Sequence, residues 1–353
     1  MDISGKIIWQ QASGDTDRNY SDLCIKLGVI LNGPGKEGRF PDCVDALRAN
    51  GISWKKISDL RRFSEWMKDG DLVVLRLGTA KVLAVGQIVG QYEWHDEFGD
   101  VDGWNIQHVR RVRWLWSEPS SPKEFDSFCL KMGDTTQKLN PGPVTKWLSS
   151  LAIPGSAYSR PLAELPSLEK RNGIDVEEIS EFLFDHGVAS ISIKNLVDEI
   201  DELTRIAKWY QRSANTPSEH ETVAYLIVPL LRALGWTPQR MAVEWNHVDV
   251  ALFEQLPRED KSLRVVVEAK KMDNACLAAK RQAMSYAGGK TGCKRLIVTD
   301  GLRYGVYVRH ETKETFRLHA YLNLTRLRRN YPIYECEGAE DALLAMAPEW
   351  KPQ

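Results

Sequence analysis

The chain has 353 residues, of which 43% are hydrophobic, and this is enough for two or three globular domains with cores of their own. Its 47 Lys and Arg residues are balanced by 48 Asp and Glu residues, so any nucleic-acid binding has to come from local patches. The six cysteines are scattered without a C-x-x-C pair, which argues against a zinc site and a disulfide framework. The N-terminus lacks the apolar core of a signal peptide, and no apolar run reaches membrane-spanning length. We therefore expect a cytoplasmic protein with no membrane partner.

Residues 1–150 are expected to form one β-rich module. Eight of the twelve tryptophans lie in this stretch, which sets it apart from the rest of the chain. Apolar segments bounded by glycines predict strands, and short helices are expected near 40–50 and 57–67. The predicted strands are KIIWQ (6–10), DLVVLRL (71–77), KVLAVGQIVGQY (81–92) and HVRRVRWLW (108–116).

The remainder divides into three expected parts. Residues 151–174 carry Pro, Ser and Gly without periodicity and are interpreted as a linker. Residues 175–214 show apolar side chains at helical spacing and are interpreted as a helical connector. Residues 215–353 alternate between helix and strand patterns, which predicts an α/β sheet with flanking helices. Its expected helices are 221–236 and 275–289, and its expected strands are 247–253, 264–271, 295–301 and 303–309.

The segment 264-RVVVEAKK-271 places charged residues at the end of a strand that is otherwise apolar. Side chains alternate across a strand, so Glu268 and Lys270 share one face. Asp249 lies in a second apolar strand, and pairing of the two strands would bring both carboxylates to one divalent cation. Carboxylate oxygens suit Mg²⁺, and Mn²⁺ is expected to substitute for it. Glu219, at the start of the preceding helix, is the best candidate for a further metal ligand, with Glu221 second.

This pattern is typical of phosphodiester hydrolysis. The metal lowers the pKa of the attacking water, and a lysine beside it can orient that water or stabilise the transition state. A structural interpretation stays open, in which Asp249 and Glu268 form ion pairs with Lys270 or Lys271 in a non-catalytic domain.

Residues 216–310 resemble the PD-(D/E)XK nuclease superfamily, and above all the nuclease domain of type I restriction motor subunits. The resemblance is carried by six elements in order, listed here: Glu219, 226-LIVPLLRALGW-236, Val248-Asp249, 268-EAK-270, Gln282 with Tyr286, and 299-TDG-301. It implies catalytic roles for Asp249, Glu268, Lys270, Glu219 and Gln282, with Tyr286 supporting the site and the bound strand.

A basic segment follows the predicted site. We interpret its side chains as a phosphate footprint, with a solvated helix face as the alternative. The residues are Lys271, Lys280, Arg281, Lys290, Lys294 and Arg295.

Residues 1–150 resemble the EVE-like branch of the PUA superfamily. The carrying segments are 7-IIWQQASGD-15, 64-SEWMKDGDLVVLRLGTAKVLAVGQIVGQYEW-94 and 108-HVRRVRWL-115. The resemblance implies a pocket that binds a nucleobase, often a modified one flipped from the helix, between aromatic rings. Trp9, Trp94 and Trp104 are the candidates for the aromatic cage. His108 and Arg110 are expected either to line the pocket or to brace the barrel, and Trp66, Trp114 and Trp116 are expected in the core.

The predicted fold class is therefore a multidomain α/β protein, with a PUA/EVE-like β-barrel, a helical connector and an α/β/α PD-(D/E)XK nuclease core. The predicted function is a Mg²⁺-dependent, type IV-like restriction endonuclease that recognises a modified base in double-stranded DNA and acts against phage. A homodimer is expected, because each nuclease core makes one cut. Two alternatives stay open: a nuclease activated by a nucleotide or RNA ligand, and a non-catalytic adaptor that binds nucleic acid.

Overall fold

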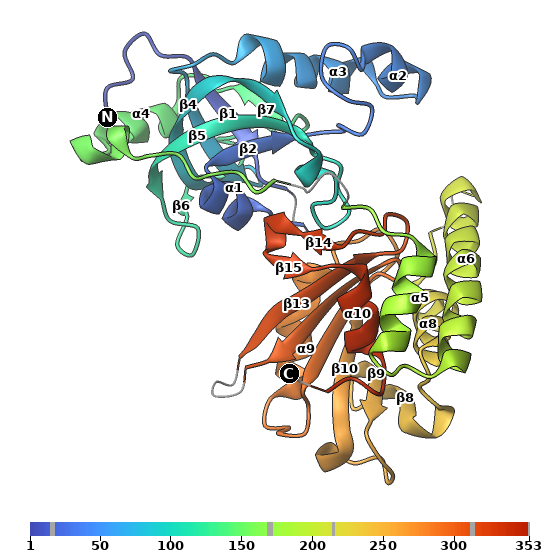
Figure 1. Ribbon diagram of the computed structural model, residues 1–353. Helices are drawn as coiled ribbons and strands as arrows, with labels where there is room; N and C mark the ends of the chain where they lie inside the picture. Colours follow the sequence, from blue (N-terminus) through green and yellow to red (C-terminus); the bar gives the residue numbers. More distant parts are fainter. Residues whose placement is uncertain (15–17, 168–171, 214–215, 311–314, 352–353) are drawn as a thin grey trace. The chain divides into compact units, whose positions relative to one another are not determined.

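The computed structural model describes residues 1–14, 18–167, 172–213, 216–310 and 315–351. The chain divides into two compact units, Met1–Ser167 and Leu168–Gln353, each of which is described by itself (Figure 1). Both units combine a β-sheet with helices, so the expectation of a multidomain α/β protein is confirmed at this level. Within the described ranges, no helix has the length and apolar character needed to cross a membrane.

The N-terminal unit is built on a seven-stranded sheet with the order β2-β5-β4-β3-β1-β7 and with β6 paired to β4. All its pairs are antiparallel except β1 with β3. The strands are β1 (Ile8–Ala12), β2 (Val29–Asn32), β3 (Leu72–Leu77), β4 (Lys81–Trp94), β5 (His108–Ser117), β6 (Lys123–Glu124) and β7 (Thr136–Lys138). The helices are α1 (Ser21–Leu27), α2 (Val44–Ala49), α3 (Trp54–Arg61) and α4 (Pro143–Ser150).

This sheet curls because its longest strand is bent. The register of β4 against β5 shifts between Val85 and Gly86 and again between Val89 and Tyr92, and bulges of this kind bend a strand. Gly86 has no room for a side chain, since a Cβ atom there would lie 2.4 Å from Cγ1 of Val112. The curl brings the edge strands β2 and β7 together at their side chains, where Asn32 Nδ2 donates to Thr136 Oγ1 at 3.1 Å.

Two expectations about core tryptophans meet different outcomes. Trp114 is buried, as expected, and its indole nitrogen donates to the carbonyl of Cys24 at 3.0 Å. Trp66 is 49% exposed, so its assignment to the core is wrong. The chain continues from α3 into a π-helical turn, η1 (Arg62–Trp66). This turn is wider than an α-helical one, so it rotates Trp66 away from the buried face that a 3.6-residue period predicts.

The C-terminal unit is built on an eight-stranded sheet with the order β14-β15-β13-β12-β11-β10-β9-β8. Parallel pairing joins β10 to β11 and β13 to β15, and the other pairs are antiparallel. The strands are β8 (Met241–Trp245), β9 (Val248–Phe253), β10 (Leu263–Ala269), β11 (Arg295–Thr299), β12 (Arg303–Arg309), β13 (Phe316–Asn323), β14 (Asn330–Tyr331) and β15 (Cys336–Glu337). The helices are α5 (Val176–Asp185), α6 (Ser190–Ser213), α7 (Glu219–Thr222), α8 (Val228–Ala233), α9 (Lys280–Ala287) and α10 (Ala339–Met346), and a π-helical turn, η4 (Val223–Ile227), joins α7 to α8.

Helices cover both faces of this sheet. Apolar side chains of α5, α6, α8 and α10 form one core with the face that carries Val265 and Val267. Helix α9 covers the opposite face, where Ala283 lies in a second core with Val266. Residues 175–214 were expected to form a separate connector, but Leu196 and Leu203 of α6 are buried in the first core. The amphipathic pattern of α6 therefore serves the sheet of its own unit.

Candidate functional site

Two carboxylates lie opposite each other at the ends of the neighbouring strands β9 and β10. Val267 pairs with Val250, so Glu268 and Asp249 occupy the next antiparallel position and share one face of the sheet. The backbone N–H of Ala269 donates to Oδ2 of Asp249 at 2.7 Å, which fixes the aspartate against the end of β10. The strand pairing expected from the sequence is thus present.

Glu268 is a buried acid with one oxygen unpaired. Its side chain is 1% exposed, and Oε1 accepts a hydrogen bond from Nζ of Lys270 at 3.1 Å. Oε2 is buried and has no hydrogen-bond partner among the described residues. Burial raises the pKa of Glu268 to about 7, and the nearby charges of Asp249 and, more weakly, Glu219 act in the same direction.

Lys270 is held between the strand and helix α9. Its ammonium group also donates to Oε1 of Gln282 at 3.1 Å, and Nε2 of Gln282 donates to the hydroxyl of Tyr286 at 3.2 Å. Gln282 and Tyr286 are one helical turn apart on α9, so both can point toward the end of β10. The three side chains form one hydrogen-bonded chain that ends on Glu268.

Glu219 and Glu221, the two candidates for a further metal ligand, differ in their contacts. The carboxylate of Glu221 accepts from the backbone N–H of Ser218 at 2.7 Å in a capping box, and this hydrogen bond lowers its pKa. Glu219 is half-buried and contributes to the electrostatic field at Glu268. Of the two acids, Glu219 is the one whose charge acts on Glu268.

The donor set fits a divalent metal ion in part. Oxygen donors from Asp249 and Glu268 suit Mg²⁺, and a buried carboxylate oxygen without a partner is what a cation would satisfy. In the ranges that the structure describes, no group of three or more acidic, His or Cys side chains lies close enough to enclose a metal. Glu219 thus lies within electrostatic range of the pair without completing a closed site.

The expected phosphate footprint is smaller than the sequence suggested. Arg295 is 2% exposed, donates to the carbonyls of Ala345 and Ala347, and stacks on Trp350 at 4.9 Å, so it belongs to the core. Lys280 is half-buried over the ring of Tyr307, and burial lowers its pKa. The other expected contacts differ in their exposure: Lys271 and Arg281 are exposed, whereas Lys290 and Lys294 are half-buried.

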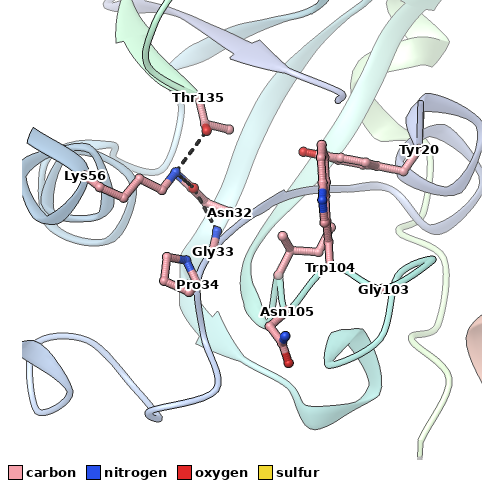
Figure 2. Close-up of a pocket in the computed structure, with 10 residues that line it drawn as sticks. Tyr20, Asn32, Gly33, Pro34, Lys56, Gly103, Trp104, Asn105 and Thr135 are labelled. Carbon is pink, nitrogen blue, oxygen red and sulfur yellow. Dashed lines mark hydrogen bonds between the residues drawn. The ribbon is translucent and has the colours of Figure 1, made fainter. Parts of the chain in front are cut away.

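The N-terminal unit holds a pocket of about 380 Å³ at the seam where β2 and β7 meet (Figure 2). Trp104 forms one wall, with Tyr20 packed edge-on against it at 5.7 Å between ring centroids. The guanidinium of Arg18, which does not line the pocket, stacks on Trp104 at 4.6 Å. The lining residues are Tyr20, Asn32, Gly33, Pro34, Lys56, Gly103, Trp104, Asn105, Ile106 and Thr135.

A polar wall faces Trp104 across the pocket (Figure 2). Nζ of Lys56 donates to Oδ1 of Asn32 at 2.8 Å, to Oγ1 of Thr135 at 3.0 Å and to Oδ2 of Asp59 at 2.7 Å. Asp59 is fully buried and also accepts from the backbone N–H of Thr136. All three ammonium protons are therefore engaged, and the wall is held in one arrangement.

Of the four predicted base-binding residues, only Trp104 lines this pocket. Trp9 is fully buried and donates to Oδ2 of Asp71 at 2.8 Å, so its ring faces are not available for stacking. Trp94 donates to the carbonyl of Gly35 at 2.9 Å and lies outside the lining. His108 is buried behind the pocket, where it bonds to the hydroxyl of Tyr92 and the carbonyl of Pro34, and burial lowers its pKa to about 4.

Arg110 takes the bracing role that was left open for it. Its guanidinium is buried and donates to the carbonyls of Phe63, Ser64 and Met67 around the turn η1. Sequence reasoning missed Tyr20, Asn32, Lys56 and Thr135, which come from four separate segments. A local signal exists for Asn32 alone, which ends β2 and opens the sequence Asn32-Gly33-Pro34.

We predict that the buried acid makes stability depend on pH. The pKa of Glu268 rises from 4.5 to about 7 on folding, so the stability that it contributes is complete below pH 4.5 and is lost as the pH rises through 7. Glu268→Gln should therefore raise the melting temperature by roughly 5 °C at pH 8 in a metal chelator, and by much less at pH 5. Differential scanning calorimetry measures this, with exposed Glu181→Gln as the control. An equal effect at both pH values would contradict the prediction.

Comparisons with known proteins assign no activity. No curated protein and no solved structure matches the chain. Residues 9–134 match the model of a family described as a domain of unknown function, DUF8426. The match covers about a third of the chain and includes every lining residue of the pocket except Thr135. The N-terminal unit, with its pocket, is thus similar over most of its length to a family whose function is not known.

Proposed function

We propose that the chain is a metal-dependent endonuclease that recognises a modified base in double-stranded DNA and restricts phage. The observation that carries the proposal is the buried, unpaired Oε2 of Glu268 opposite Asp249, with Lys270 bonded to the same carboxylate. An acid and a lysine placed together at the end of a core strand are costly to bury, and a metal-assisted hydrolytic site explains that placement. The resemblance to the PD-(D/E)XK and EVE-like families points the same way.

Asp249 and Glu268 are the residues that would hold Mg²⁺ or Mn²⁺, with Glu219 nearby. A bound metal lowers the pKa of an attacking water and offsets the charge that develops on the phosphate. Lys270 supplies a positive charge beside that phosphate, and Gln282, held by Tyr286, fixes the direction of its ammonium group. The half-buried position of Lys270, 25% exposed, strengthens its electrostatic effect relative to a surface lysine.

The pocket in the N-terminal unit supports recognition of a planar base. Its volume of about 380 Å³ is near the lower end of the range for small-molecule sites. A base would stack on Trp104 and present its polar edge to Asn32 and Thr135. Because Lys56 already donates all three of its protons, this wall favours a neutral, hydrogen-bonding edge over a phosphate group. This argues for a base in DNA over a nucleotide signal read through its phosphates.

The nuclease core makes one cut per site, so we propose that two copies act together for a double-strand break. Unmodified host DNA would be spared because it does not occupy the reader pocket. A ligand base in RNA or in a free nucleotide is the competing input, and an adaptor without catalysis is the competing role.

Removing the lysine tests the catalytic proposal. Lys270→Ala should lower the rate of Mg²⁺-dependent cleavage of phage DNA carrying hydroxymethylated or glucosylated cytosine by at least about 100-fold, because the variant loses the charge beside the phosphate. Lys261→Ala, an exposed lysine of the same unit, is the matched control and should cleave at the wild-type rate. Gel assays of initial rates measure both, and equal activity of the two variants would refute the role of Lys270.

Removing the stacking wall tests the reader. Trp104→Ala should weaken binding of a duplex with the recognised modified base by about 10-fold or more, since stacking on an aromatic ring is worth roughly 1–3 kcal/mol. Trp66→Ala removes a half-exposed tryptophan outside the pocket and should leave the affinity unchanged. Fluorescence anisotropy in a metal chelator, which prevents metal-dependent cleavage, gives the dissociation constants. An unchanged affinity of Trp104→Ala would exclude this pocket as the reader.

A further inference from the structure

A buried carboxylate lies in the turn that joins β11 to β12. Asp300 is fully buried, and its Oδ1 accepts from the backbone N–H groups of Leu302 at 3.1 Å and Arg303 at 2.7 Å. These two hydrogen bonds stabilise the turn itself. They occupy only one of the two carboxylate oxygens.

The second oxygen ties this turn to another part of the chain. Oδ2 of Asp300 accepts from the backbone N–H of Asp273 at 3.2 Å and from Nη1 of Arg303 at 2.6 Å. Nη2 of Arg303 lies 3.4 Å from Oδ1 of Asp273, which closes a three-residue ionic cluster. The backbone of Asp273 has a φ of +68°, in the left-handed region, so the cluster holds a conformation that a non-glycine residue adopts at a cost.

Residues 271–274, which the ionic cluster holds at Asp273, lie just after β10, the strand that carries Glu268. The backbone N–H of Lys270 donates to the carbonyl of Thr299 at 2.8 Å, and the N–H of Asn274 donates to the carbonyl of Lys271 in the next turn. From there the chain leads into α9, which carries Gln282. Residues 271–274, which Asp300 holds through the backbone of Asp273, therefore lie between the two residues of the Lys270–Gln282 hydrogen bond.

Stability alone does not account for an ionic cluster here. Burying a carboxylate and a guanidinium is costly, and buried ion pairs are often no more stable than well-packed apolar residues of similar volume. Strands β11 and β12 are also held together without the cluster, because Thr299 already pairs with Tyr304 in the sheet. What the cluster adds is a fixed path for residues 271–274.

We propose that Asp300, through Arg303 and Asp273, is a positioning residue that holds Lys270 in register with Gln282. This inference rests on the proposed nuclease function, since it assigns the cluster to the geometry of that site. It makes Asp300 a residue that affects the rate without touching the substrate or the metal.

Asp300→Asn tests the proposal, because the amide keeps the size and one acceptor but loses the charge opposite Arg303. We expect kcat to fall about 10-fold or more, with KM and the Mn²⁺ dissociation constant within about twofold of the wild type. Hydrogen exchange of residues 270–279 should become faster. The matched control is Glu340→Gln, which breaks the Arg329–Glu340 ion pair, 3.3 Å long, elsewhere in the same unit. The control should leave kcat and the exchange at 270–279 unchanged.

A second variant keeps the test decisive if Asp300→Asn does not fold. Asp273→Asn alters the side of the cluster that is 42% exposed and should change kcat and exchange in the same direction by a smaller factor. Wild-type kcat together with wild-type exchange in the folded variants overturns the proposal. If the wild-type protein cleaves no DNA, the nuclease function fails, and unchanged exchange at 270–279 then separately overturns the cluster's positioning role.

Discussion

The C-terminal unit is organised around one costly feature, a carboxylate buried at the end of a central strand. Glu268 shares one oxygen with Lys270 and leaves the other without a hydrogen bond among the described residues. Strand β9 brings Asp249 opposite it, α9 brings Gln282 to Lys270, and the end of β11 accepts a hydrogen bond from the backbone of Lys270. Within the ranges that the structure describes, only Lys270 bonds to the carboxylate of Glu268 itself, and the neighbouring elements hold that lysine in place at the end of the strand.

The site of this unit was predictable because it depends on local periodicity. The two-residue repeat of a strand puts Val266 and Glu268 on one face, and the helical repeat puts Gln282 and Tyr286 together. The ranking of Glu219 above Glu221 as a further ligand stays a prediction, and the capping box that engages Glu221 at Ser218 became visible only in three dimensions. The burial of Arg295 was not predictable, since α10 and its carbonyls were absent from the expected elements.

The pocket of the N-terminal unit was largely unpredictable for the opposite reason. Its walls come from segments far apart in the sequence that meet only because bulges in β4 curl the sheet. Trp9 and Trp104 look alike as sequence positions, yet one is buried in the core and the other forms a wall. Lys56 comes from helix α3 and is held at the pocket by the fully buried Asp59.

The most direct test of the whole account is cleavage of matched DNA. The purified protein would be incubated with Mg²⁺ and either phage DNA carrying hydroxymethylated or glucosylated cytosine or the same sequence without modification. The account predicts double-strand breaks in one of the modified DNAs and none in the unmodified DNA. Equal cleavage of modified and unmodified DNA would contradict the coupling of a base reader to a nuclease.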